Sequence, residues 1–197
     1  MPEATSPLSF AVLLGSVRRE RMGIRAAKLA THALEARGHE AVLVDPVVVQ
    51  LPLLDRMYKE YAAGTAPPSL EQLATLYRRV DGFVIVSGEY NHGIPPALKN
   101  LLDHFLEEYF WRPSAIVCYS AGMFGGVRAA VALRTTLAEL GMPAIPSECP
   151  IPRIAAALDE DGKPQNEHVP RTLDRFLDEL EWYARALQRQ RRGGTPY

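Results

Sequence analysis

The amino-acid sequence predicts a doubly wound α/β fold, in which helices cover both faces of a parallel β-sheet. Short apolar runs alternate along the chain with longer segments whose apolar residues recur at helical spacing, which is typical of βα units. The apolar runs are nearly continuous, as expected for strands that are buried on both faces. The length of 197 residues suits one domain.

Five apolar runs are predicted to form the strands. Five βα units in fewer than 200 residues fit a flavodoxin-like five-stranded parallel sheet better than a six-stranded dinucleotide-binding fold. Right-handed crossovers leave few other topologies for such a chain. The predicted strands lie at residues 8–14, 41–44, 83–86, 115–119 and 143–147, of which the last is the weakest.

Helical patterns follow the strands and complete the predicted domain. The residues Ser69-Leu70-Glu71-Gln72 predict a capping box, in which the Ser69 hydroxyl accepts from the third helical amide and Gln72 reaches back. The domain is predicted to span 1–197, with 1–7 and 191–197 as flexible tails. The other helical patterns cover 24–34, 95–105, 127–140 and 169–187, and the segment 47–68 is irregular.

Composition argues against several classes of partner. Lys and Arg total 22 against 23 Asp and Glu, so no excess positive charge is available for nucleic acid. No stretch approaches the roughly 18 apolar residues that a membrane span needs, and residues 1–7 lack the pattern of a signal peptide. The two cysteines and five histidines show no metal-ligand spacing. We expect a cytoplasmic protein with reduced thiols and no metal, nucleic-acid or membrane partner.

The candidate site lies in the loops after the first, third and fourth predicted strands. In an open α/β sheet, ligands bind beyond the carboxyl ends of the strands, where the strand order reverses. These loops are rich in Gly, Ser, Arg or Asn, and they span 15–23, 87–94 and 120–126.

The first loop predicts phosphate binding. The Ser16 hydroxyl can donate to a phosphate oxygen, Arg18 and Arg21 can add charge-assisted hydrogen bonds, and the next helix adds free amides. The loop matches neither G-x-G-x-x-G nor the P-loop, so both of those interpretations weaken. A solvated basic turn is the alternative. Asp45, which follows the second strand, is interpreted as part of an Asp-Pro turn instead of a ribose ligand.

The other two loops offer groups that suit a flat heterocycle. Tyr90 can stack beside a ring and Asn91 carries both a donor and an acceptor, although an ordinary turn explains these residues as well. Glycines within 122–126 allow the backbone to approach a ligand closely. Ser120 lies on a strand-to-helix turn, but this turn lacks the first glycine of G-x-S-x-G, which argues against a serine hydrolase. Cys118 lies inside an apolar strand and is interpreted as a core residue.

At these residues the sequence resembles the NAD(P)H-dependent FMN reductases of the flavodoxin-like superfamily, with their quinone- and azo-reducing relatives. The resemblance covers about residues 8–150 in the correct order, and it is specific because the motifs after the first and third strands stand on alternate strand ends of one sheet. The matching motifs are Gly15-Ser16-x-Arg18, Glu89-Tyr90-Asn91, Ile94-Pro95, Leu98-Lys99-Asn100-Leu101-Leu102-Asp103 and Ser120-Ala121-Gly122.

The resemblance implies FMN as cofactor and NAD(P)H as co-substrate. It implies no obligatory side-chain acid or base, so no catalytic residue is assigned. Family members often have Pro at the position of Gly88, Ser at that of Arg21 and Asn at that of Gly23. Arg21 is expected to replace the lost hydroxyl as a phosphate donor. The implied cofactor-binding residues are Ser16, Arg18, Arg21 and Gly23 in the first loop, and Glu89, Tyr90, Asn91, Ser120 and Gly122 in the other two.

The function implied by the resemblance is an oxidoreductase. FMN would take hydride from NAD(P)H and pass electrons to a quinone, an azo compound, free flavin or a similar small-molecule acceptor. One alternative is a flavodoxin-type electron carrier without nicotinamide activity, but such carriers are usually strongly acidic, whereas this chain has a net charge of −1. Another is a non-redox binding module that has lost the flavin. Candidates for the 2′-phosphate of NADPH are Arg112, Arg128 and Arg153.

The resemblance also implies a homodimer or homotetramer. The helical face with Leu101, Leu102, Phe105 and Leu106, followed by the aromatic residues 109–111, is more apolar than one helix packing on a sheet requires. Because aromatic side chains are enriched in interface cores, we expect this helix to form the dimer contact. Burial in the core of one chain is the alternative.

Overall fold

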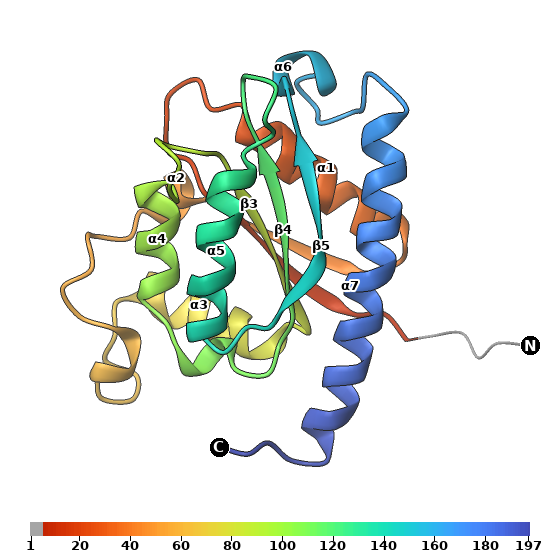
Figure 1. Cartoon of the computed structure of the whole chain (residues 1–197). Helices are drawn as coiled ribbons and strands as arrows, with labels where there is room; N and C mark the ends of the chain where they lie inside the picture. The colour runs from red at the N-terminus through yellow and green to blue at the C-terminus, as the bar shows by residue number, and fades with distance from the viewer. Residues whose placement is uncertain (1–5) are drawn as a thin grey trace, which may run out of the picture.

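The computed structural model describes residues 6–197 and confirms the predicted fold class. All the strand pairs are parallel, and the order in the sheet is β2-β1-β3-β4-β5 (Figure 1). The order reverses between β1 and β3, which puts the switch point where the sequence predicted it. The strands are β1 (Ser9–Leu14), β2 (Glu40–Val44), β3 (Gly82–Ser87), β4 (Ser114–Tyr119) and β5 (Ala144–Ile151).

Helices cover both faces of this sheet and bury two apolar cores. The long helices α1 and α7 pack on one face, whereas α3, α4 and α5 pack on the other (Figure 1). No helix of residues 6–197 is both long and apolar enough to cross a membrane. The helices are α1 (Gly23–Ala36), α2 (Pro46–Val49), α3 (Pro68–Arg79), α4 (Pro96–Asp103), α5 (Val127–Glu139), α6 (Ile154–Ala157) and α7 (His168–Arg192), with the 3₁₀ turns η1 (Tyr58–Glu60) and η2 (Glu107–Tyr109).

The alternation of side chains along each strand explains the continuous apolar runs. In β1, Phe10 and Val12 point to the core under α1 and α7, while Ala11 and Leu13 point to the core under α3, α4 and α5. All four side chains are fully buried. Each central strand must therefore be apolar at every position, and its polar residues are confined to its ends.

The predicted capping box at Ser69 is wrong. Helix α3 begins at Pro68, two residues before the predicted first helical residue Leu70, with Pro67 as its N-cap and no side-chain cap. Proline at the first helical position has a fixed φ and needs no hydrogen-bond partner for its nitrogen, so it starts the helix by itself. Glu71 occupies the region instead, and its carboxylate accepts hydrogen bonds from the Ala66 amide at 3.3 Å and the Tyr58 hydroxyl at 2.8 Å.

The residues 191–197, for which a flexible tail is predicted, contact the rest of the chain in this structure. Helix α7 continues to Arg192, and the Arg191 guanidinium pairs with Asp81 at 3.0 Å. The ring of Tyr197 then packs against Phe110 and Trp111, with centroids 5.4 and 5.0 Å apart. The tail predicted at 1–7 lies outside the described residues for positions 1–5.

The helix that was expected to form a dimer contact is part of the core. In α4 and the residues after it, Leu101, Leu102, Phe105 and Tyr109 are at most 2% exposed within one chain. Their rings and methyl groups pack on Tyr77 and Phe83, which belong to α3 and β3. These side chains therefore belong to the core of one chain, whereas Leu106, Phe110 and Trp111 are partly exposed, and the dimer contact stays a prediction.

Gly126 provides a test of how tightly the end of β4 is packed. Its φ is +80°, and a β-carbon would lie 2.7 Å from the Tyr119 carbonyl oxygen. Because both the backbone conformation and the contact oppose a side chain, Gly126→Ala should lower the free energy of unfolding by about 2 kcal/mol or more. Thermal unfolding measures this change, with Gly193→Ala as the control because its β-carbon meets only an ordinary contact at 3.4 Å. Equal effects of the two substitutions would contradict the prediction.

Candidate functional site

A cavity of about 250 Å³ opens at the carboxyl ends of β1, β3 and β4. It lies at the switch point of the sheet, between the three loops that the sequence selected. Six of the nine predicted site residues line it, while Gly23, Asn91 and Gly122 do not. The lining residues are Ser16, Arg18, Glu20, Arg21, Met22, Gly88, Glu89, Tyr90, Tyr119, Ser120, Ala121 and Ile154.

The β1–α1 loop presents hydroxyl and guanidinium groups to this cavity. Ser16 is 2% exposed, and its hydroxyl shares a hydrogen bond with the Tyr90 hydroxyl at 3.1 Å. The Arg18 amide donates to the same Ser16 oxygen at 3.4 Å, and the Arg18 side chain is exposed at the mouth. Gly15 keeps the loop close to the sheet, because its amide donates to the Val86 carbonyl at 2.9 Å. The loop therefore combines donors that an anionic group requires at the N-terminus of α1.

Arg21 is held inside the loop by an acidic partner. Its two terminal nitrogens donate to the two carboxylate oxygens of Asp45 at 2.5 Å each, and one of them also donates to the Ser16 carbonyl at 2.9 Å. Both side chains are largely buried. Asp45 also caps α2 by accepting from the Val47 amide at 2.9 Å. Arg21 thus fastens the first loop to the end of β2, in addition to lining the cavity.

Glu89 joins the β3 loop to α5. Its carboxylate accepts from the Arg128 amide at 3.0 Å and pairs with the Arg128 guanidinium at 3.4 Å. A carboxylate at a helix N-terminus satisfies free amides and is favoured by the helix dipole. Asn91 lies beyond the cavity with φ of +51°, in a turn where Tyr90 and Gly93 exchange two backbone hydrogen bonds. The turn interpretation of Asn91 therefore has structural support, and its amide stays a predicted ligand.

The β4–α5 loop uses its serine to shape itself. The Ser120 hydroxyl donates to the Gly122 carbonyl at 2.9 Å and accepts from the Gly125 amide at 2.8 Å. Gly122 also accepts from the Arg153 amide at 2.8 Å, which ties this loop to the residues after β5. Since both functions of the hydroxyl serve the loop, Ser120 is not arranged as a nucleophile.

The three arginines suggested for a 2′-phosphate lie at different places. Arg112 lies at the start of β4, at the opposite end of the sheet, where its guanidinium donates to three backbone carbonyls. Burial lowers its pKa to about 10. Arg128 pairs with Glu89 and lies 4.4 Å from the centre of the Phe124 ring, and Arg153 precedes α6 at the carboxyl end of β5. Only Arg128 and Arg153 remain near the cavity.

Tyr119 is the main cavity residue that sequence reasoning missed. It ends β4, is 8% exposed and lines the cavity. A β-carbon on Gly23 would lie 2.3 Å from its hydroxyl oxygen, and one on Gly88 would lie 3.1 Å from that atom. Two departures from the family pattern, at positions 23 and 88, therefore meet at one side chain. A large polar residue at a strand end, with glycines at these two positions, was the available signal.

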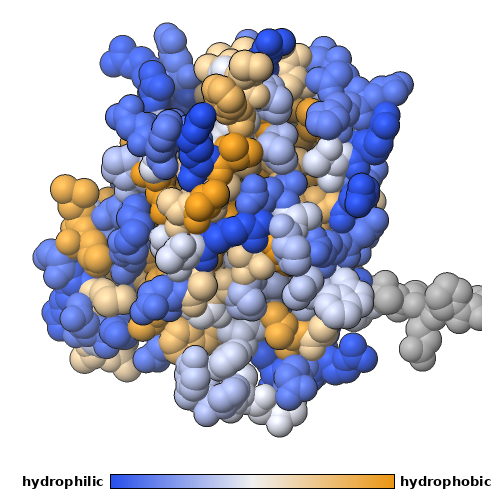
Figure 2. Space-filling view, viewed as in Figure 1, coloured by the Kyte–Doolittle hydropathy of each residue, from blue (hydrophilic) through white to orange (hydrophobic). Residues whose placement is uncertain are grey.

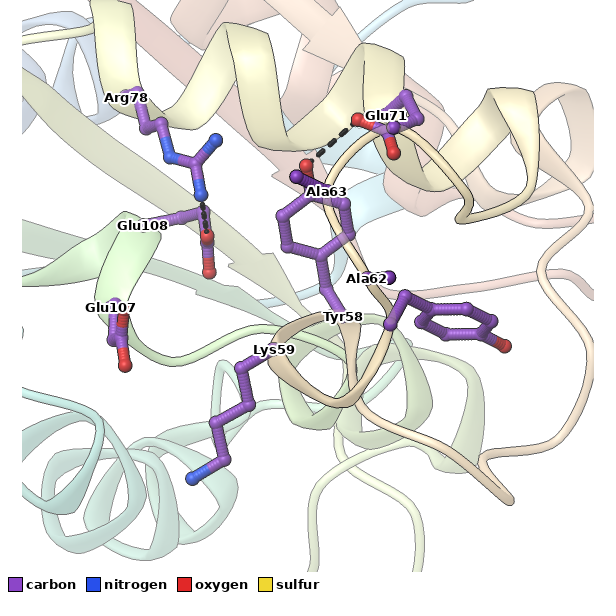
Figure 3. Close-up of a pocket in the computed structure, with 10 residues that line it drawn as sticks. Tyr58, Lys59, Ala62, Ala63, Glu71, Arg78, Glu107 and Glu108 are labelled. Carbon is purple, nitrogen blue, oxygen red and sulfur yellow. Dashed lines mark hydrogen bonds and ion pairs between the residues drawn. The ribbon is translucent and has the colours of Figure 1, made fainter.

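A second hollow of about 460 Å³ lies at the opposite end of the sheet (Figure 3). Figure 3 shows the Tyr58 hydroxyl donating to Glu71 and the Arg78 guanidinium paired with Glu108, at 2.8 and 2.6 Å. Arg78 and Glu108 precede β3 and β4, so this hollow is remote from the carboxyl ends of the strands. None of the predicted site residues lines it.

Comparison with known families decides the assignment. The family model described as NADPH-dependent FMN reductase matches residues 8–156, which is more than half of the chain. The chain belongs to this family. The resemblance stated from the sequence motifs is thereby confirmed, and the matched region includes every predicted site residue.

Individual relatives agree with this assignment. A quinone reductase of Pseudomonas putida KT2440 is 32% identical over 177 residues, covering 86% of this chain and 91% of the relative. An NADPH azoreductase of Bacillus sp. OY1-2 is 28% identical and covers 70% of this chain and 78% of its own. Among solved structures, the flavoenzyme NAD(P)H:(acceptor) oxidoreductase FerB from Paracoccus denitrificans superposes with a TM-score of 0.71 at 23% identity, covering 89% and 98% of the two chains.

The residues present at the cavity fit FMN, the cofactor of this family. A buried serine hydroxyl, an exposed arginine and the first turn of α1 provide donors for a phosphate monoester. The backbone of residues 88–90 and the loop with Ser120 both line the cavity, so they could border a flat ring on two sides. Ser16 and Arg18 could hold the phosphate, whereas Glu89 could act through its backbone because its carboxylate binds α5.

The Arg21–Asp45 pair is expected to contribute measurably to the free energy of unfolding of the protein. Arg21→Gln leaves a largely buried carboxylate without its cation, so we expect a loss of about 1–3 kcal/mol in the free energy of unfolding. Urea unfolding of the apoprotein measures this loss. Arg19→Gln is the matched control, since Arg19 lies in the same loop and is exposed. A cost of Arg21→Gln no larger than that of Arg19→Gln would show that the pair adds nothing to stability.

Proposed function

We propose that this member of the FMN reductase family uses NAD(P)H to reduce a quinone or an azo compound through FMN bound in the cavity of about 250 Å³. The observation that carries this proposal is the convergence of Ser16, Arg18 and Tyr90 at the switch point of the sheet. The acceptor class is inferred from relatives that are named quinone reductase and NADPH azoreductase.

The chain's own groups would bind and orient the cofactor. FMN supplies the redox chemistry by taking up hydride from NAD(P)H and giving electrons to the acceptor. Ser16 and Arg18 would anchor the phosphate, while Arg21 keeps the loop in place through Asp45. Tyr90 is held by its hydrogen bond to Ser16. The residue that would border the flavin ring is thereby linked to a residue that would bind the phosphate. Holding both reactants at one place supplies proximity and orientation.

We propose that the protein forms a homodimer or homotetramer through α5 and the loop before it. Exposed apolar residues gather here, and Figure 2 shows them as orange atoms over α5 and its preceding loop. Val131 is 67% exposed and Phe124 is 58% exposed. Contiguous exposed apolar groups are typical of interaction surfaces. The same loop contributes Ser120 and Ala121 to the cavity, so a partner on this surface would cover the rim of the site.

We also propose a cytoplasmic location. Cys118 and Cys149 are both free and buried, and they belong to the cores on opposite faces of the sheet. Burial raises the pKa of both thiols to about 12, so they stay protonated and unreactive. Such cysteines suit a reducing compartment, where disulfides are rare.

An anaerobic titration tests the enzymatic proposal. Purified protein saturated with FMN should lose the visible absorption of oxidised flavin on addition of NADPH or NADH, much faster than free FMN does under the same conditions. A quinone or an azo dye added afterwards should restore the absorption. FMN that binds without bleaching would favour a carrier without nicotinamide activity, and a protein that binds no FMN would refute both flavin hypotheses.

The oligomer proposal predicts the effect of a charge on α5. Val131→Glu should shift the protein to monomers at micromolar concentration, because a carboxylate buried in an interface lacks a partner. Sedimentation velocity measures the shift. Trp182→Glu on α7 is the control, because Trp182 is also 67% exposed but lies on the helix that covers the other face of the sheet. A wild-type monomer, or equal dissociation of both variants, would argue against this surface.

A further inference from the structure

The side chain of Tyr119 passes between two glycines beneath the cavity. Tyr119 is the last residue of β4 and belongs to the core under α1 and α7. A β-carbon on Gly23 would lie 2.3 Å from its hydroxyl oxygen and 2.6 Å from Cζ. A β-carbon on Gly88 would lie 3.1 Å from both of these atoms. The phenol therefore occupies the space that side chains at positions 23 and 88 would need.

The backbone does not explain these two glycines. Neither Gly23 nor Gly88 has the positive φ that favours glycine, unlike Gly125 and Gly126 in the neighbouring loop. Gly23 is the first residue of α1, where glycine costs stability relative to alanine because it adds freedom to the unfolded chain. What the two positions share is the close approach of the Tyr119 side chain.

The hydroxyl of Tyr119 lies beside the first residue of α1. Its neighbour Gly23 opens α1, whose free amides favour an anion. Burial raises the pKa of Tyr119 to about 12, and Tyr90 adds to the rise, whereas Ser16 and the charges of Arg18 and Arg21 act in the opposite direction. Tyr119 lines the same cavity as Ser16, Arg18 and Arg21, the residues that would hold a phosphate. Its phenol is protonated at neutral pH and can donate a hydrogen bond.

We propose that the Tyr119 hydroxyl binds the phosphate of FMN, and that Gly23 and Gly88 are glycines because this side chain fills the space of their β-carbons. The inference rests on the proposed FMN site. In this arrangement a residue from β4 supplies a donor to a phosphate that is otherwise held by the β1–α1 loop. The phosphate ligands of the site then follow or end two strands instead of one. The two glycines leave the room that the tyrosine side chain needs to reach the phosphate.

Cofactor titration tests the role of the hydroxyl. Tyr119→Phe keeps the ring and removes the donor, so the dissociation constant for FMN should rise at least about tenfold, as expected when a hydrogen bond to a charged group is lost. Riboflavin lacks the phosphate, and its dissociation constant should change by less than about twofold by the same argument. Quenching of flavin fluorescence measures both values. Arg18→Ala is the comparator, since it should show the same selective loss.

The outcomes separate this inference from the proposed function. Unchanged FMN binding by Tyr119→Phe, with FMN bound normally by the wild-type protein, would overturn the phosphate contact and leave the FMN site intact. Equal weakening of FMN and riboflavin would also overturn it, because the hydroxyl would then contact the ribityl chain or the ring. Failure of the wild-type protein to bind FMN would refute the proposed function itself.

A double-mutant cycle tests the glycines without any cofactor. Gly23→Ala should lower the melting temperature of the apoprotein by about 5 °C or more, because a β-carbon overlaps the phenol. In the Tyr119→Ala background the same substitution should be neutral or raise the melting temperature, since alanine suits the first turn of α1. Gly193→Ala, after α7, where a β-carbon meets only an ordinary contact, should behave alike in both backgrounds. An equal cost of Gly23→Ala in both backgrounds would contradict the inference.

Discussion

The direct pairing of β1 with β3 is the contact on which the rest of this structure depends. Leu13 pairs with Ile85 and Leu14 with Val86, so both strands end at the same height in the sheet. The segments that leave β1 and β3 then pack on opposite faces, with α1 on one side and α4 on the other. Two loops are forced apart at one point, and the cavity between them is the place where an open α/β sheet can accept a ligand.

Two carboxylates then organise the loops around this cavity. Asp45 at the end of β2 holds Arg21, and Glu89 at the end of β3 holds the start of α5. Each acid comes from one strand end and binds an element that follows another. The loops are therefore joined to one another across the sheet, although loops of this kind have little core of their own. A site that binds a large, flat cofactor benefits from such preorganisation, because fewer groups lose freedom on binding.

The sequence predicted the fold and the site loops well because both depend on local patterns. Continuous apolar runs require burial on both faces, and a motif such as Gly15-Ser16-x-Arg18 is read within four residues. The errors concern choices between alternatives that the local pattern allows. Ser69 is not the N-cap, because α3 begins at Pro68 with Pro67 as its N-cap. Leu101 and Phe105, which were assigned to an interface, are buried in the core of one chain. Hydrophobic periodicity shows that a face is buried, but not whether its own chain or a second copy covers it.

The features that sequence reasoning missed are contacts through space. The partner of Arg21 lies 24 positions away, directly after β2, and the side chain that meets Gly23 is 96 positions further along the chain. Departures at positions 23 and 88 looked like independent losses of side chains that the family often has. In the structure, both glycines lie against Tyr119. The phenol from β4 fills the space that side chains at these two positions would occupy. The side chains around a cavity must pack without overlap as well as provide binding groups. One large residue can therefore be accommodated only where its neighbours are small.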